Sequence, residues 1–469
     1  MVLIKYTQNL AISDRQMKPR LDPASKLTQG TLFDEVGPAL VDFIDLKNPL
    51  VRLADSMQWE LFDDHWRALH SSVAGPMASS GRRVAGLLML KHMEAVSDER
   101  LMDLWVTNPY YQYFCGETHF QHRPPVDPTS LIKWRHRLGE EGMEWLLTTV
   151  VDSAVNSGVV DRSSFSHVSV DSTVMEKNIA YPTDSALLEK LRVKLVAFMQ
   201  EHGLNIRQTY SRQGPRTAQK IGRYAHAKQF KRMRASIRKL RTWVGRLQRE
   251  LERQLDKVPE VARPRADELI SLADRLFAQI KDIKTKDKLY SLHEQDVDCI
   301  SKGKARKRYE FGTKVGIVCT QKENFVVGMR SYPGNPYDGH TLDDMLQQSE
   351  TITATKTKTV VVDLGYRGKH DTHADVIHRG RKLSKRQKKR LRRRSAIEAI
   401  IGHMKVDGLL DRCHLKGKYG DAVHAILCGI GHNLRQMRAF WVRCLFWLLH
   451  LCHFRQKPVI SLRIACIAA

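Results

Sequence analysis

The stretch from Thr359 to Lys405 constrains the fold more than any other part of the chain. It opens with an apolar run of three valines that ends at Asp363 and is followed by the breaker Gly365. A basic tract then leads into a segment with helical spacing that carries Glu398. A strand and a helix would therefore each deliver one carboxylate, with cationic side chains between them. We interpret this stretch as half of a metal-dependent site for phosphodiester chemistry.

The other half requires an acidic residue at the end of a second strand. Residues Phe165 to Val170 alternate between apolar and polar types and lead to Asp171. Alternation of this kind is typical of a half-buried strand. The sequence therefore predicts that Asp171 lies at a strand end, as Asp363 does.

The charge of the chain points to a polyanionic partner. The 77 Lys and Arg residues outnumber the 51 Asp and Glu residues, which gives a formal net charge of +26. Such an excess favours nucleic acid or an anionic membrane surface as the partner. The apolar stretch from Ala439 to Leu451 is too short to span a bilayer and is interrupted by Arg443, so we expect a packing or dimer helix there and no membrane segment.

The cysteines indicate a reducing compartment. The 8 Cys are scattered without a C-x-x-C pair, and the N-terminus lacks the features of a signal peptide. We therefore expect a cytoplasmic protein without disulfides. Zinc-finger spacing is absent from the clustered Cys and His residues, which are Cys413, His414, Cys444, His450, Cys452 and His453.

Periodicity divides the chain into five segments. Apolar spacing predicts short helices over residues 36–155, which is compatible with a helix-turn-helix DNA reader or with a plain helical scaffold. The pattern from Phe230 to Leu251 is a heptad repeat that resumes after Pro259 and Pro264, so we expect an antiparallel helical hairpin. The predicted segments are an irregular segment 1–35, a helical N-terminal domain 36–155, a catalytic core 163–184 plus 305–435, a helical insertion 185–304 and an apolar tail 436–469.

Without the insertion, the order of elements predicts one α/β fold. The strand with Asp171 is followed by a hairpin over 313–331, a helix, the strand with Asp363, a short strand and the helix with Glu398. That order is typical of a ribonuclease-H-like mixed sheet, in which the strands carrying the two aspartates lie side by side. The predicted fold class is thus a ribonuclease-H-like α/β core with an all-α N-terminal domain and a helical insertion.

Three carboxylates suit hard divalent cations. Two Mg²⁺ ions can activate an attacking hydroxyl and stabilise the leaving oxygen of a phosphodiester. Asp171, Asp363 and Glu398 are the predicted ligands. Arg394 and Lys405 fall on about one helix face with Glu398, where they would hold phosphates or orient the glutamate. Surface ion pairs of little energetic value are the alternative.

The basic tract before Glu398 is predicted to bind DNA phosphates, because counterion release makes such tracts effective. A solvated basic loop is the alternative. The residues assigned to this contact are Lys385, Arg386, Lys388, Lys389, Arg390, Arg392 and Arg393.

These residues resemble the DDE transposases of bacterial insertion sequences, in particular the group named after insertion sequence five. Members carry a Y-x2-R-x3-E-x6-K signature, which Arg394, Glu398 and Lys405 match, while Leu391 occupies the tyrosine position. Asp171 in VSVDSTVMEKNIAYPTD and Asp363 in VVVDLGYRGK look like the two aspartates of the family. The segments LMLKHMEAVSDERLMDLWVTNPYYQYFCGE and GNPYDGHTL are also similar to family sequences.

The resemblance implies binding of terminal inverted repeats and target DNA. It further implies two Mg²⁺ or Mn²⁺ ions, strand cleavage by water and attack of the freed 3′-hydroxyl on the target. We expect a homodimer or higher homo-oligomer on DNA, in the bacterial cytoplasm and associated with the nucleoid. The alternatives are a catalytically inactive basic DNA-binding protein, such as a decayed transposase, and a stand-alone ribonuclease-H-like nuclease.

Overall fold

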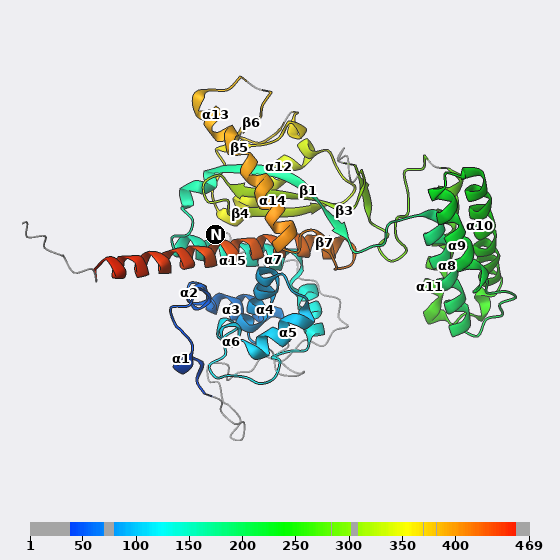
Figure 1. Ribbon diagram of the computed structural model, residues 1–469, viewed down its shortest axis with the longest axis horizontal. Helices are drawn as coiled ribbons and strands as arrows, with labels where there is room; N and C mark the ends of the chain where they lie inside the picture. The colour runs from blue at the N-terminus through cyan, green and yellow to red at the C-terminus, as the bar shows by residue number, and fades with distance from the viewer. Residues whose placement is uncertain are drawn as a thin grey trace, which may run out of the picture.

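The computed structural model describes residues 38–69, 79–282, 284–301, 308–368, 370–380 and 382–455. The predicted irregular segment 1–35 and residues 456–469 of the predicted tail lie outside this range. Figure 1 shows three parts: a set of N-terminal helices, a sheet with its covering helices, and a separate helical bundle.

The N-terminal part is helical, as predicted. Its helices pack on the long C-terminal helix α15 (Gly417–Arg455), which runs between them and the sheet (Figure 1). Gly139 has φ 69° and kinks the last helix of this part, α7, a conformation that glycine adopts without steric cost. The helices are α1 (Leu40–Phe43), α2 (Pro49–Asp55), α3 (Glu60–Trp66), η2 (Arg67–Leu69), α4 (Gly81–Glu94), α5 (Asp98–Thr107), α6 (Pro109–Phe114) and α7 (Pro128–Asn156).

The sheet is mixed and, within the described residues, contains seven strands. Strands β1, β5 and β6 are parallel, β3 is antiparallel to β1, and β4 is antiparallel to β3. Because β1 and β4 pair along the same part of β3, they lie on its opposite edges, which gives the order β4-β3-β1-β5-β6. The strands are β1 (His167–Lys177), β2 (Asp298–Ile300), β3 (Glu310–Thr320), β4 (Val326–Tyr332), β5 (Thr359–Val361), β6 (Asp375–Ile377) and β7 (Arg412–Cys413). This topology is consistent with a ribonuclease-H-like core.

The prediction that Asp171 ends its strand is wrong. Strand β1 continues six residues beyond it to Lys177, because β3 pairs with β1 as far as Glu176. The parallel partner β5 stops earlier, since Val361 pairs with Ser169. Asp171 therefore lies in mid-strand, just past the carboxyl end of its parallel neighbour.

Helices cover the sheet and connect its strands. The hairpin of β3 and β4 was predicted correctly, and the helix after it, α12, begins at Asp338. The predicted boundary at residue 436 falls inside α15, which continues without a break to Arg455. The remaining elements are η3 (Arg162–Ser166), α12 (Asp338–Thr353), η6 (Leu364–Tyr366), α13 (Lys385–Arg392) and α14 (Ser395–Asp407).

The insertion is a helical bundle with its own core, in which the predicted helical hairpin is present and two further helices pack against it. The heptad segment and the segment after the prolines form α10 and α11, as expected, but α8 and α9 pack against them. Helix α9 buries only one large apolar side chain, Ile221, so few large apolar residues mark it in the sequence. The bundle elements are α8 (Asp184–Glu201), α9 (Gln213–His226), α10 (Phe230–Glu252), η4 (Leu255–Lys257), η5 (Glu260–Ala262) and α11 (Arg263–Lys281).

Candidate active site

Two aspartates lie close together just past the carboxyl end of strand β5. Asp171 on β1 accepts a hydrogen bond from the Ser172 amide at 2.8 Å. Asp363 follows β5 and caps η6, where its carboxylate accepts from the Leu364 amide at 2.6 Å. These local hydrogen bonds fix both carboxylates beside the backbone that carries them.

Glu398, on α14, is linked to the two aspartates through the side chain of Arg394. The Arg394 guanidinium donates to Glu398 Oε1 at 2.5 Å, one helical turn away. Its Nη1 atom lies 3.9 Å from Asp171 Oδ2 and 3.8 Å from Asp363 Oδ2. The two aspartate oxygens can therefore be no more than about 7.8 Å apart, twice the longer of these distances.

The structure thus brings Asp171, Asp363 and Glu398 together around one cationic side chain. Along the chain, Asp171 and Asp363 are 192 residues apart, and Asp363 and Glu398 are 35 residues apart. Clustered carboxylates repel one another unless a cation lies between them. In the chain alone Arg394 supplies that cation; that the carboxylates hold metal ions stays a prediction.

A second layer of polar residues supports the aspartates, and sequence reasoning assigned none of them a role. Asp338 accepts hydrogen bonds from Ser172 Oγ at 2.9 Å and from Lys314 Nζ at 3.0 Å. Burial, with the nearby carboxylates of Asp338 and Asp171, raises the pKa of Tyr366 well above its ordinary value. The signal for Asp338 was the motif GNPYDGHTL, in which it is the only acidic residue.

Lys405 lies beside the cluster and contacts the backbone of β1. Its ammonium donates to the Val174 carbonyl at 2.7 Å, three residues beyond Asp171. This contact ties α14 to the strand that carries the first aspartate. The predicted catalytic role of Lys405 stays a prediction, and the observed contact is a positioning one.

The basic tract forms a helix and not the loop of the alternative, and its contact with DNA phosphates stays a prediction. Ser384 and Gln387 form a capping box that starts α13. Arg390 donates to the Gln321 side chain and Arg393 to the Lys322 carbonyl, both in the turn between β3 and β4.

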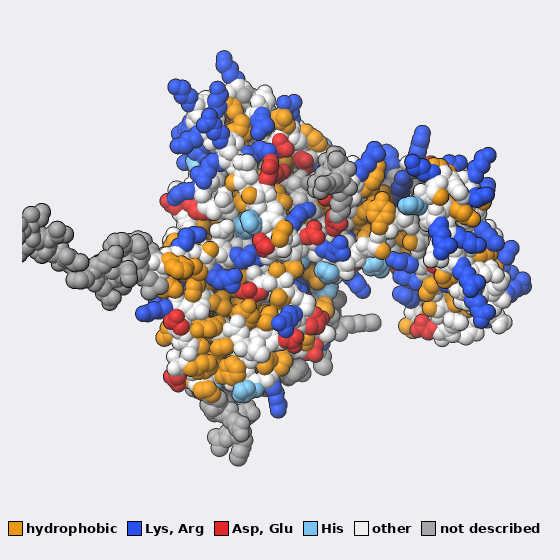
Figure 2. Space-filling model, in the orientation of Figure 1, with side chains coloured by type: hydrophobic (Ala, Val, Ile, Leu, Met, Phe, Trp, Pro, Cys, Tyr) orange, Lys and Arg blue, Asp and Glu red, His pale blue; other side chains and the backbone are white. Residues whose placement is uncertain are grey.

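These contacts place α13 by the amino ends of the parallel strands, because Gln321 also hydrogen-bonds the His167 carbonyl at the start of β1. The tract therefore lies at the opposite end of the sheet from the carboxylates, and only its last residue adjoins Arg394 in the chain. Six of its seven assigned cations are exposed and Arg390 is half-buried. Figure 2 shows Lys and Arg side chains gathered over this region and over the helical bundle.

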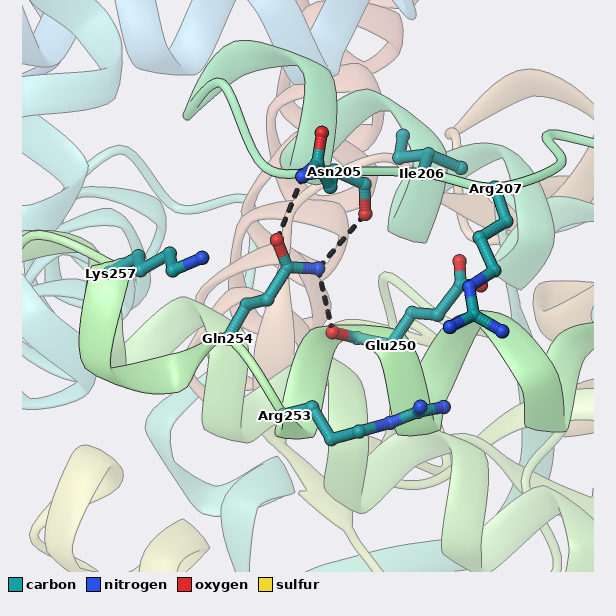
Figure 3. Close-up of a pocket in the computed structure, with 7 residues that line it drawn as sticks. All are labelled: Asn205, Ile206, Arg207, Glu250, Arg253, Gln254 and Lys257. Carbon is teal, nitrogen blue, oxygen red and sulfur yellow. Dashed lines mark hydrogen bonds between the residues drawn. The ribbon is translucent and has the colours of Figure 1, made fainter.

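A hollow of about 390 Å³ lies in the bundle, away from the carboxylates. The Gln254 side chain crosses it and hydrogen-bonds the backbone amide and carbonyl of Asn205, each at 2.9 Å (Figure 3). Arg207, Arg253 and Lys257 line it, facing one acidic residue, Glu250. The hollow is basic and open, and nothing in it resembles a catalytic constellation.

The mixed sheet with clustered carboxylates is consistent with the class of proteins that carry a DDE core. Residues 38–137 match a family model described as "Transposase domain (DUF772)", and residues 281–434 match one described as "Transposase DDE domain". Asp363 and Glu398 lie inside the second match, whereas Asp171 lies before it.

A relative from Rhizobium meliloti is described as an uncharacterized protein, ORF8, in the nfe locus. It is 42% identical over 187 residues, which cover 40% of this chain and 90% of the relative. No solved structure gives a significant match. The chain belongs to the transposases with a DDE domain, and this domain implies a transposase enzyme.

In the described residues, no helix combines the length and hydropathy that a membrane crossing requires.

Proposed function

We propose that this chain is the transposase of an insertion sequence of the group named after insertion sequence five. It binds terminal inverted repeats, cleaves DNA and joins the 3′-hydroxyl ends to target DNA. The convergence of Asp171, Asp363 and Glu398 on Arg394 carries the proposal. The match of Arg394, Glu398 and Lys405 to the family signature supports the group.

The donor set fits divalent cations. Three carboxylates surround a position that the Arg394 guanidinium group now occupies, and carboxylate oxygens are the ligands that Mg²⁺ and Mn²⁺ prefer. Asp171, Asp363 and Glu398 would hold the ions. When bound, two such ions supply activation of the attacking hydroxyl and stabilisation of the leaving oxygen.

The chain itself supplies orientation and charge. Lys314 and Ser172 hold Asp338 behind the aspartates, and Lys405 holds α14 against β1. Arg394 would give up its place among the carboxylates if metal ions were bound there, and it would remain close enough to pair with a phosphate of the DNA. Exposed cations on α13 bind the DNA farther from the reacting bond.

A cleavage assay on DNA that carries the ends of the element, with Mg²⁺, tests the proposal. Asp363→Asn keeps the cap of η6, since Asn also caps helices well, but removes one anionic ligand. We expect DNA binding within about twofold of the parent and nicking reduced at least about a hundredfold.

The exposed Asp371 provides the matched control, and Asp371→Asn should nick like the parent. Equal nicking by Asp363→Asn and the parent would show that the site is wrongly assigned. A parent that binds the ends but never nicks them would favour the inactive DNA-binding protein. Cleavage without preference for the ends would favour the nuclease.

A further inference from the structure

We infer that the chain holds a structural zinc ion where the N-terminal helices meet α15, bound by His92, His424 and Cys428. The inference goes beyond the proposed function, because these residues lie outside the carboxylate cluster. It holds whether or not the protein cleaves DNA.

The three side chains converge although His92 is separated from the others by more than 300 residues of sequence. His424 and Cys428 are one turn apart on α15 and share a helix face. His92 projects from α4 opposite them, and the two imidazole rings lie 5.6 Å apart between centroids. One ligand atom from each residue lies within 4.8 Å of the other two.

Both imidazoles are oriented for metal binding. His92 Nδ1 contacts the Leu88 carbonyl at 3.1 Å, and His424 Nε2 contacts the Leu409 carbonyl at 3.0 Å. A carbonyl oxygen only accepts, so each of these ring nitrogens carries the proton. The other nitrogen of each neutral ring is therefore left with a lone pair. Zinc-binding histidines are held in this way by a hydrogen bond from their second nitrogen.

His92 Nε2 is the second, independent sign of a ligand. It is buried with no hydrogen-bond partner, in a residue that is only 1% exposed. A buried polar atom without a partner costs roughly 1 to 3 kcal/mol. A bound ion at the centre of the three side chains would give this nitrogen its partner.

The chemistry of the ligands favours zinc over the ions expected at the carboxylates. Two imidazoles and a thiol suit Zn²⁺, whereas Mg²⁺ requires oxygen ligands. Ligand atoms around a tetrahedral zinc ion are roughly 3.3 to 3.8 Å apart, so the three atoms would close by at most about 1.5 Å. Among the cations near the site, Lys91 and Arg135 are both paired with Asp98, and Arg435 donates to the His92 carbonyl.

The site would fasten two parts of the molecule together. Helices α4 and α15 are already in close contact here, since Arg435 of α15 donates to the His92 carbonyl at 2.7 Å. A zinc ion bound only by the folded chain adds its binding free energy to stability.

Metal analysis of the full chain, without a histidine tag, tests the inference. The protein is stripped with a chelator, equilibrated with Zn²⁺ in excess Mg²⁺, and freed of loosely held ions. We expect about one zinc ion per chain for the parent, and less than about a fifth of that for Cys428→Ser and for His92→Gln.

Two control variants lie on the same helix. Cys444→Ser removes the thiol near the Cys and His cluster of the C-terminal segment, and His432→Gln removes a buried imidazole outside the site. Both should retain the parent zinc content. Parent zinc content below about half an ion per chain, or unchanged binding in Cys428→Ser, would overturn the inference.

Cobalt gives a measurement that does not depend on how the variants fold. Co²⁺ bound by the parent should show a charge-transfer absorption from a thiolate ligand, and Zn²⁺ should abolish it by displacement. A cobalt spectrum without a thiolate band in the parent would also contradict the assignment.

Discussion

Arg394 and Glu398 lie one helical turn apart, and the guanidinium donates to the carboxylate at 2.5 Å. The same guanidinium faces Asp171 and Asp363. In the chain alone, one arginine therefore offsets part of the negative charge of the cluster, in the position where divalent cations are proposed to bind. Competition between this side chain and the metal ions is the direct consequence.

Replacing Arg394 with glutamine should strengthen the response to Mg²⁺. Without the guanidinium the carboxylates repel one another, so metal ions gain more by entering. Half-exposed Glu398 and Asp363 keep the effect modest, and we expect about 1 kcal/mol of extra stabilisation, or a roughly fivefold lower Kd for Mg²⁺. Thermal unfolding across a Mg²⁺ titration measures it.

Arg438→Gln is the control, because Arg438 pairs with Glu94 away from the cluster. Its Mg²⁺ response should equal that of the parent. The same response in Arg394→Gln would mean that the arginine and the metal ions do not compete.

Neutralising the exposed cations of α13 should weaken DNA binding without slowing the chemical step. Their helix starts at the far end of the sheet, about 12 Å of helix from Arg394. With Lys385, Lys388, Lys389 and Arg392 changed to glutamine, the slope of log K against log salt should fall by roughly 3. Binding isotherms at several salt concentrations and cleavage rates at saturating DNA test this. A lower cleavage rate at saturating DNA, with an unchanged slope of log K against log salt, would instead place the tract at the reacting bond.

Buried His432 should make the fold sensitive to acid. Burial, with the nearby charge of Arg435, lowers its pKa to about 4 from an ordinary 6.5. The unfolded chain takes up a proton that the folded chain refuses, so stability is lost as pH falls from about 6.5 to about 4.

His432→Gln should therefore retain about 2 to 3 kcal/mol more of its neutral-pH stability at pH about 4.5 than the parent does. Urea unfolding at both pH values, without added zinc, provides the comparison. The exposed His403 supplies the control variant His403→Gln, which should follow the parent. Equal losses of stability on acidification in His432→Gln and in the parent would show that His432 does not cause the loss of stability in acid.

Gly431 should not tolerate a side chain. A Cβ atom there would lie 2.4 Å from the His92 carbonyl oxygen, so α4 and α15 would have to separate. Gly431→Ala should destabilise the protein by about 1 to 3 kcal/mol. At Gly402 on α14 a Cβ meets nothing within 4 Å, and Gly402→Ala should stabilise by about 0.5 to 1 kcal/mol. Thermal unfolding of the two variants tests both expectations. Equal unfolding midpoints for the two variants would contradict the close approach of α4 and α15.

Local patterns predicted much of the fold. The run of valines forms strand β5, which ends just before Asp363, and the segment around Glu398 is a helix. Both could be predicted because an element that buries one or two of its faces repeats apolar residues at a characteristic spacing. The heptad in α10 was legible for the same reason. Helix α9 was not predicted, because it buries only one large apolar side chain and is otherwise rich in cations.

The order of elements predicted that β1 and β5 lie side by side, which is correct, but other pairing and long-range contacts were not predicted. The length of β1 depends on its pairing with β3, which no local period records, so Asp171 was placed at a strand end. The tract before Glu398 was expected beside the carboxylates, but the contacts of Arg390 and Arg393 lead to the turn at the other end of the sheet.

The sequence by itself determined the candidate site residues and the family that they resemble. These residues are two aspartates after apolar segments and a glutamate on a helix that follows a basic tract. Tertiary structure alone decided that Arg394 occupies the centre of the carboxylates and that His92 meets His424 and Cys428. Local periodicity reports only which face of an element is buried. The partner of that face is set by packing between segments hundreds of residues apart, and a single sequence carries no local trace of it.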